Sequence, residues 1–200
     1  MLLRSSPASP YGRKVKIALA LLGLTDRVRV EDTDTMAEGD AIRRQNPLGK
    51  IPTLVLDDGA SLYDSRVILE YLDHMAGGGR IIPMGEARFP VLTNQALADG
   101  LLDAALLQVY EGRWRSEEHR DRRWLSHQTD KVARALTAME AAPPRIDMAP
   151  DVGCIATACA LGYLDLRFEG RWREERPKLV AWLDGFSTRV PAFEQTRLPT

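Results

Sequence analysis

The sequence changes its pattern abruptly at the AGGG segment 76–79, and this change constrains the fold more than any other feature. Before it, short strand-like and helix-like stretches alternate, whereas after it the periodicity is helical throughout. The glycines and the following Pro83 interrupt both patterns, which is typical of a segment that joins two folding units. We therefore expect an N-terminal domain over residues 1–76, a linker over 77–86 and a C-terminal domain over 87–200.

The first part predicts the element order β-α-β-α-β-β-α. Pro10 suits the first turn of a helix, where its missing N–H costs nothing, and Gly23 suits the residue that ends this helix. The DDG sequence at 57–59 predicts a hairpin turn. Ser65 is a candidate N-cap for the last helix of this part. The expected strands are 1–4, 28–31, 53–56 and 61–63.

The second part predicts a bundle of helices. Two long periodic segments, 87–114 and 117–142, are sufficient for an antiparallel helix pair. Asp151 can cap a third helix that runs to Phe168, and apolar residues over 179–186 line a fourth. The fold class is therefore an α/β domain followed by an all-α domain.

Charge and composition exclude several classes of protein. Lys and Arg number 27 against 28 Asp and Glu, so the net charge of -1 argues against a nucleic-acid partner. No apolar run reaches the roughly 18 residues that a membrane-spanning helix needs, and the N-terminus lacks the apolar stretch of a signal peptide. Cys154 and Cys159 do not form a CxxC motif, which favours reduced, buried thiols in a cytoplasmic protein. The histidines show no metal-ligand spacing, so we expect no metal.

Ser9-Pro10-Tyr11 marks the start of the first helix. A hydroxyl at this place lies beside unpaired backbone N–H groups and the positive end of the helix dipole. That environment stabilises an anion, including a thiolate. Taken alone, the motif is explained better by a simple N-cap role of Ser9.

Two further motifs lie in the first part. Pro52 begins a predicted strand, and if the Ile51–Pro52 bond is cis, the N–H and C=O of Ile51 can pair with an extended peptide. An ordinary trans proline is the better explanation from this dipeptide alone. Asp64-Ser65 precedes an apolar helix and either caps it or forms an anion site fit for a carboxylate.

Together, and in this order, the motifs SPY at 9–11, NPLGKIPTL at 46–54 and LYDSRVILEYL at 62–72 closely resemble the N-terminal domain of cytosolic glutathione transferases of the serine type, as found in bacteria. The segment ACALGYLDLRF at 158–168 resembles the core helix of that family's C-terminal domain. The resemblance covers almost the whole chain. It implies a thioredoxin-like α/β domain followed by an all-helical domain, with glutathione bound as co-substrate.

Carried over by position, the resemblance assigns the glutathione site. Ser9 would donate a hydrogen bond to the sulfur, although Ser5 and Ser6 are also close to the turn. Ile51, before a cis Pro52, would pair with the cysteinyl group, and Lys50 would contact the glycyl carboxylate. Ser65 would bind the γ-glutamyl carboxylate and Asp64 its ammonium. The family commonly has Glu where this chain has Asp64, which loosens the ammonium contact.

The resemblance also implies a function. The glutathione thiolate would attack a small, hydrophobic electrophile, as in detoxification, in the cytoplasm. The candidate walls of the electrophile pocket are Tyr11, Tyr110, Arg113 and Trp114, whose aromatic rings are explained equally well as helix-pair core. A homodimer is implied, with Arg66 and the segment Leu92 to Asp103 at its interface. The alternatives are a non-catalytic binding or interaction protein on the same fold, and a glutathione-dependent isomerase or reductase.

Overall fold

A four-stranded sheet in the order β2-β1-β3-β4 forms the first layer of the computed structural model, which describes residues 1–146 and 149–198. β1 (Leu2–Ser5) runs parallel to β2 (Arg29–Asp32) and antiparallel to β3 (Thr53–Val55), which pairs antiparallel with β4 (Ser61–Leu62). The four predicted strands are therefore confirmed, with ends shifted by one residue. The last two residues of the expected C-terminal domain lie outside the described part.

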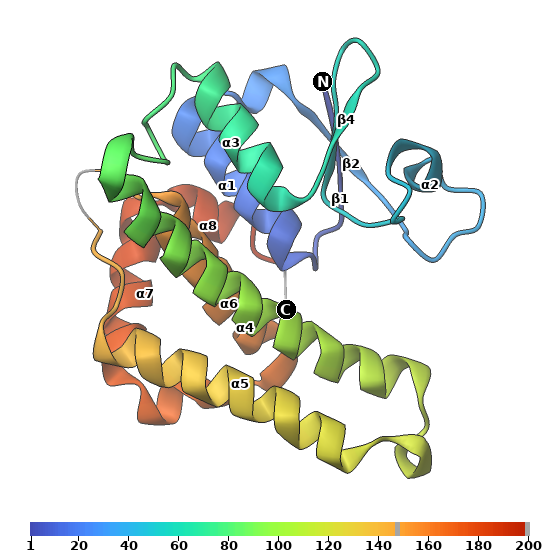
Figure 1. The fold of residues 1–200 in the computed structure, drawn as a ribbon, viewed down its shortest axis with the longest axis vertical. Helices are drawn as coiled ribbons and strands as arrows, with labels where there is room; N and C mark the ends of the chain where they lie inside the picture. The colour runs from blue at the N-terminus through green and yellow to red at the C-terminus, as the bar shows by residue number, and fades with distance from the viewer. Residues whose placement is uncertain (147–148, 199–200) are drawn as a thin grey trace.

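Three helices accompany the sheet. α1 (Pro10–Leu22) and α3 (Ser65–Met75) pack together on one face, and the short α2 (Ile42–Gln45) lies beyond the other (Figure 1). Pro10 is at the start of α1 and Gly23 ends it at φ 69°, as the sequence predicts.

The N-cap of α3 is Asp64, so the prediction that Ser65 caps this helix is wrong. An Asp64 carboxylate oxygen accepts the N–H of Arg66 at 2.9 Å from an extended backbone, and Ser65 becomes the first helical residue. Both residue types are good caps and they are adjacent. The sequence alone therefore placed this helix start one residue late.

The second layer is a helical bundle built around α6 (Val152–Phe168), most of whose residues are buried. α4 (Arg88–Trp114) and α5 (Arg122–Ala141) form the expected antiparallel pair, and α7 (Pro177–Arg189) and α8 (Pro191–Gln195) complete the bundle (Figure 1). Short 3-10 helices connect elements in both layers. They lie at Thr25–Arg27, Gly85–Ala87, Glu117–His119 and Arg171–Glu175.

The start of α5 differs from the prediction, and the start of α6 agrees with it. α5 begins at Arg122 and not at residue 117, because the Asp121 side chain accepts the N–H groups of Arg123 and Trp124 and caps the helix there. Asp151 caps α6 as expected, accepting the N–H of Cys154 at 2.9 Å.

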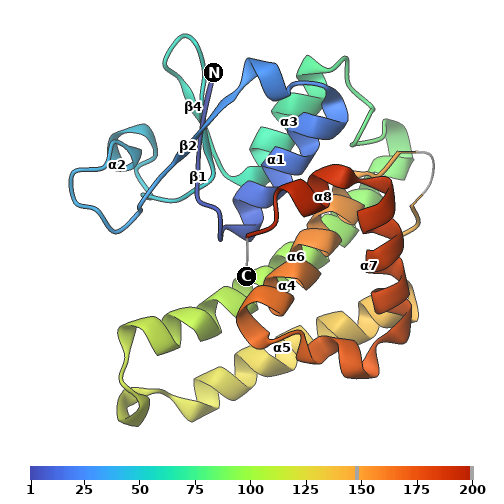
Figure 2. The same ribbon diagram turned by 180° about the vertical axis from the view of Figure 1, so that it is seen from behind.

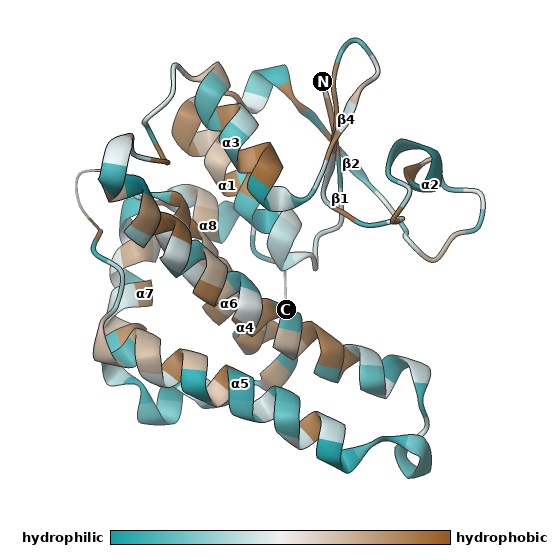
Figure 3. Ribbon diagram, in the orientation of Figure 1, coloured by the Kyte–Doolittle hydropathy of each residue, from teal (hydrophilic) through white to brown (hydrophobic). Residues whose placement is uncertain are grey.

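Packing of α1 against α6 joins the two layers. From behind, α8 also lies against α1 (Figure 2). Hydrophobic residues gather along α1, α4 and α6, whereas the connection between α4 and α5 is mostly hydrophilic (Figure 3). None of the described helices is both long and apolar enough to cross a membrane.

Asp73, near the end of α3, holds the segment that leads to α4. Its carboxylate is buried and accepts three backbone N–H groups, from Gly79 at 2.8 Å, Arg80 at 2.9 Å and Ile81 at 2.8 Å. The carbonyl of Ile81 then accepts the N–H of Val152 at the start of α6, at 2.9 Å. A chain of hydrogen bonds therefore links α3 to the central helix of the bundle.

Candidate functional site

Ser9 is the N-cap of α1 and is half-buried. Its hydroxyl oxygen accepts the N–H of Gly12 at 3.1 Å, and its own N–H donates to the carbonyl of Ser6 at 3.2 Å. Because the hydroxyl oxygen acts as the acceptor, its proton is available to a ligand beyond the helix end. A thiolate at this position would meet a hydroxyl donor and the positive end of the helix dipole.

Gly12 brings a second hydroxyl close to Ser9. A Cβ atom on Gly12 would lie 2.0 Å from Oγ of Ser5 and 3.4 Å from Oγ of Ser9, so no larger residue fits. Ser5 is only 1% exposed and its hydroxyl donates to the carbonyl of Ser6 at 3.4 Å. Ser9 is therefore better placed than Ser5 to donate to a ligand.

The Ile51–Pro52 bond is cis, as the resemblance implies. The side chain of Asn46 holds this turn, since its Nδ2 donates to the carbonyl of Lys50 at 3.0 Å and to the hydroxyl of Thr53 at 3.1 Å. Lys50 itself is exposed and Ile51 is half-buried. The sequence motif contains Asn46 but indicates no function for it, whereas in the structure its side chain stabilises the turn before β3.

Asp64 and Ser65 lie at the start of α3 with different exposures. Asp64 is exposed, whereas Ser65 is 2% exposed. Nε of Arg66 lies 3.8 Å from the Asp64 carboxylate and 3.3 Å from that of Asp99 on α4. The starts of α1 and α3 and the turn before β3 share one edge of the N-terminal layer (Figure 1). The elements that carry the predicted glutathione-binding residues therefore lie along the same edge (Figure 1).

Between α1 and α4 lie polar contacts that the sequence analysis missed. Lys14 and Asp99 form an ion pair with exposed side-chain fractions of 0% and 2%, and the Tyr11 hydroxyl donates to Asp103. Burial raises the pKa of Asp99, although Lys14 and Arg66 act in the opposite direction. Burial, and next the bond to Asp103, raise the pKa of Tyr11, so its hydroxyl stays protonated. Asp99 and Asp103 are one helical turn apart and share one face of α4, and this spacing was the sequence signal for a polar face that contacts α1.

The four predicted pocket-wall residues come from two helices, Tyr11 from α1 and the other three from the last turns of α4. The Tyr11 hydroxyl donates to Asp103 on α4, and Asp103 lies two helical turns before Tyr110 on the same helix. The Arg113 guanidinium lies 5.1 Å from the ring centre of Tyr110, whereas Trp114 is 62% exposed. The structure therefore pairs Tyr110 with Arg113 and leaves Trp114 facing solvent.

A cavity of about 180 Å³ lies beside the Ser9 turn, and Ser9 is the only one of its lining residues to which the sequence analysis gave a role in the site. None of the four predicted wall residues lines it. Among residues 1–146 and 149–198, no group of His, Cys, Asp or Glu side chains could hold a metal ion. The walls of the cavity come from the turn before α1, the first turn of α1, and α6, α7 and α8, and they include Ser9, Pro10, Arg13, Gly162, Leu183 and Phe193.

Comparison with known proteins gives the family. Residues 8–75 match the family model described as the N-terminal domain of glutathione S-transferase. The chain is 32% identical over 205 residues to the uncharacterized GST-like protein YibF of Escherichia coli (strain K12), covering 100% of this chain and 99% of that protein.

Solved structures of glutathione transferase family members are also similar to this chain. A glutathione transferase family member from Pseudomonas fluorescens Pf-5 with bound glutathione is 43% identical, with a TM-score of 0.91 and coverage of 100% and 99%. A second structure from that organism, with bound S-(propanoic acid)-glutathione, is 42% identical with a TM-score of 0.87 and coverage of 100% of both chains. The expected two-part fold, thioredoxin-like and then helical, is thereby confirmed. The chain belongs to the glutathione S-transferase family.

Proposed function

We propose that this protein is a glutathione transferase that activates the glutathione thiolate for attack on a small, hydrophobic electrophile. The observation that carries the proposal is Ser9 at the N-terminus of α1, whose hydroxyl accepts the Gly12 N–H and keeps its own proton for a ligand. Ser9 would donate that proton in a hydrogen bond to the sulfur and would itself stay un-ionised.

The energies are sufficient for this mechanism. A free thiol has a pKa of about 8.5, and lowering it by about two units requires roughly 2.7 kcal/mol. A hydrogen bond to a charged group contributes about 1.5–3 kcal/mol, and a helix N-terminus contributes about 0.3–1 kcal/mol or somewhat more when partly buried. Ser9 and the end of α1 therefore supply enough stabilisation without a general base.

The rest of the glutathione site follows the family's pattern. Ile51, before the cis bond, would pair through its backbone with the cysteinyl group, with Pro52 setting the turn, and the exposed Lys50 would meet the glycyl carboxylate. Ser65 would bind the γ-glutamyl carboxylate and Asp64 the ammonium. The structure from Pseudomonas fluorescens with bound glutathione supports a site of this kind.

The electrophile would react by addition or displacement. A sulfur–carbon bond forms, and either a leaving group departs with its electron pair or the neighbouring carbon takes up a proton. The relative with bound S-(propanoic acid)-glutathione supports a site that tolerates a short chain on sulfur. Tyr110, Arg113 and Trp114 on α4, with Tyr11 on α1, remain our proposal for the wall that this substrate meets.

The proposal includes the organisation of the protein. We place the domains at 1–76 and 87–200 with the linker between them. A homodimer would form around Arg66 and the segment 92–103, where the exposed Val67 and Phe89 lie nearby in the sequence. A monomeric mass by light scattering would contradict the dimer. The two buried cysteines, Cys154 and Cys159, suit the cytoplasm, and detoxification is the role we expect there.

Calorimetry with glutathione tests the site. The parent chain, Ser9→Ala and Ser65→Ala are compared with Ser126→Ala, a matched change on the exposed face of α5. We expect Ser65→Ala to weaken binding at least tenfold. Ser9→Ala should keep binding but lose conjugation of an aromatic halide, and Ser126→Ala should match the parent in both.

The outcomes separate the candidate functions. If the parent shows no binding at millimolar glutathione, the transferase proposal fails and an interaction protein on the same fold replaces it. If Ser9→Ala conjugates at the parental rate while Ser5→Ala does not, the activating hydroxyl is Ser5. Binding without conjugation of any electrophile would favour the isomerase or reductase alternatives.

A further inference from the structure

The cavity beside the Ser9 turn is lined by both charged and apolar groups. Apolar walls come from Pro10, Leu166, Leu183, Phe193 and Leu198. A pocket with mostly apolar walls and a few placed polar groups is the usual form of a small-molecule site. A cavity of about 150 Å³ accommodates benzene, so this one, at about 180 Å³, can hold a ring bearing one small substituent.

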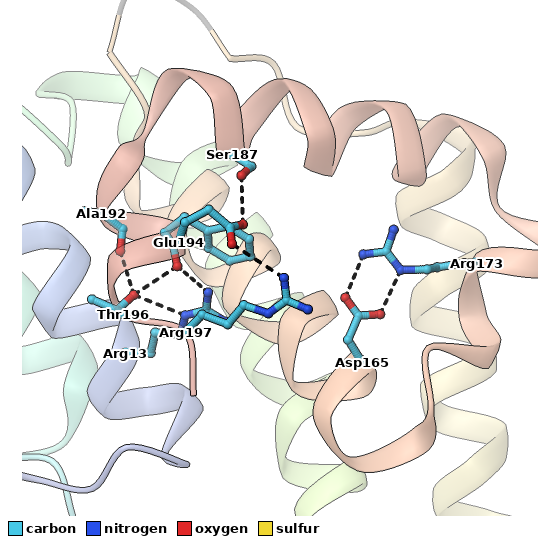
Figure 4. Close-up of polar contacts among 9 residues, drawn as sticks. Arg13, Asp165, Arg173, Ser187, Ala192, Glu194, Thr196 and Arg197 are labelled. Carbon is cyan, nitrogen blue, oxygen red and sulfur yellow. Dashed lines mark hydrogen bonds and ion pairs between the residues drawn. The ribbon is translucent and has the colours of Figure 1, made fainter. Parts of the chain in front are cut away.

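Most of the charges around the cavity are already paired. Asp165 accepts two hydrogen bonds from Arg173, at 2.9 and 2.7 Å, and one from Trp172 at 2.8 Å. Glu194 lies 3.5 Å from Arg197 and accepts the Ser187 hydroxyl at 2.9 Å. Figure 4 shows these two groups apart from each other, the Asp165 pair on one side and the Glu194 group on the other.

Arg13 is the exception among the charged residues of the walls. It is 8% exposed, and its guanidinium donates to the Thr196 hydroxyl at 3.2 Å and to the carbonyl of Phe193. The Phe193 ring lies 4.0 Å from it. Across the described ranges, 1–146 and 149–198, no carboxylate forms an ion pair with Arg13; Glu194 and Asp165 act on it only from further away.

A buried guanidinium without a carboxylate is costly, and burial lowers the pKa of Arg13. Its remaining nitrogen, Nη1, lies over Gly162, where a Cβ atom would be only 2.6 Å away. Both Gly162 and Arg13 line the cavity. Arg13 therefore presents an unused donor group at the cavity wall, and a planar carboxylate is the partner that matches a guanidinium best.

We propose that this cavity is a binding site for a small organic monocarboxylate, whose anion pairs with Arg13 and whose apolar part lies against Leu166, Leu183 and Phe193. The cavity adjoins the proposed glutathione site at Ser9, which lines it, but extends away from the rest of that site, since Lys50, Ile51, Asp64 and Ser65 do not line it. The exposed Asp184 also lines the cavity. Its carboxylate would repel a second negative charge, so the site favours ligands with a single negative charge.

Benzoate is a suitable probe, with benzamide as its neutral analogue. Binding is measured by ligand-observed NMR on the full chain, with and without saturating glutathione. We expect a Kd for benzoate on the order of 1 mM, which a ligand of this size attains, and at least tenfold weaker binding of benzamide. Glutathione should not displace benzoate.

Two variants locate the ligand. Arg13→Met removes the cation and should weaken benzoate binding at least tenfold. Ser187→Trp fills the cavity from α7 while keeping Arg13 and should abolish binding. Ser126→Ala is the control. If Arg13→Met does not fold, Ser187→Trp and the benzamide comparison still decide. No saturable benzoate binding, binding unchanged by Ser187→Trp, or displacement by glutathione would overturn the proposal.

Discussion

At the scale of single residues, Gly12 shows how tightly the Ser9 turn is built. The hydroxyls of Ser5 and Ser9 lie where a side chain at residue 12 would go, at 2.0 and 3.4 Å from its Cβ. Gly12 is inside a helix, where glycine is otherwise unfavourable by about 0.5–1 kcal/mol relative to alanine. The glycine is therefore required by the packing around the turn and not by the helix.

We predict that Gly12→Ala destabilises the protein by about 1–3 kcal/mol through overpacking and lowers conjugation at least tenfold by displacing Ser9. Gly185→Ala, in α7, is the matched control, since nothing lies within 4 Å of its added Cβ. That change should stabilise the fold by about 0.5–1 kcal/mol. Urea unfolding and a conjugation assay measure both, and equal effects of the two changes would contradict this explanation.

Cys159 in α6 predicts a pH dependence. Burial raises the pKa of its thiol from 9.0 to about 11, so the folded state holds the proton more tightly than the unfolded chain does. Stability is then fully present below pH 9 and falls as the pH rises from about 9 to 11, by about 2–3 kcal/mol. Cys159→Ala should flatten the fall in unfolding free energy between pH 9 and 10, whatever its effect at neutral pH. An unchanged slope would show that Cys159 is not the cause.

At the scale of elements, α1 and α4 are joined by the buried pair Lys14–Asp99. Removing one partner leaves a buried charge, so Lys14→Met or Asp99→Leu alone should cost about 3–5 kcal/mol. The double variant Lys14→Met/Asp99→Leu should recover most of that loss, because apolar side chains replace both charges. Unfolding in urea gives the coupling between the two sites, and additive losses would contradict the pairing.

The order and type of the elements could be predicted, because period, caps and turn residues are local signals. Two helix starts were misplaced. Ser65 was chosen as the cap of α3 instead of the adjacent Asp64, and α5 was expected to start at residue 117 although it starts five residues later, after its cap Asp121. The candidate glutathione-binding residues could be assigned because three short motifs follow one another in the order typical of the family. The spacing of Asp99 and Asp103 could have indicated a polar face on α4, but not Lys14 as the partner of Asp99, because the two are 85 residues apart.

At the scale of the whole molecule, Asp73 joins the sheet layer to the bundle through the N–H groups of Gly79, Arg80 and Ile81. Asp73→Asn keeps the size of the side chain but removes the charge and one acceptor, so we expect a loss of about 2–4 kcal/mol. Protease cleavage within 77–86 should become faster. Asp130→Asn, on the exposed side of α5, is the control, and equal cleavage rates in both variants would exclude this role.

The cavity beside Ser9 belongs to this scale too, because its walls come from the start of α1 and from three helices of the bundle. Arg13 and Phe193, which meet there, are 180 residues apart. No local pattern in the sequence marks such a site. Only the folded chain brings an unpaired guanidinium, a glycine and an aromatic ring into one wall.

The contact of Arg13 with Gly162 also limits how this protein can diverge. A side chain at 162 would strike the guanidinium, and loss of the guanidinium would leave Phe193 without the cation over its ring. Substitutions at these three positions should therefore be inherited together. Related chains that carry a bulkier residue at 162 should have given up the arginine first, whatever has happened to the catalytic turn.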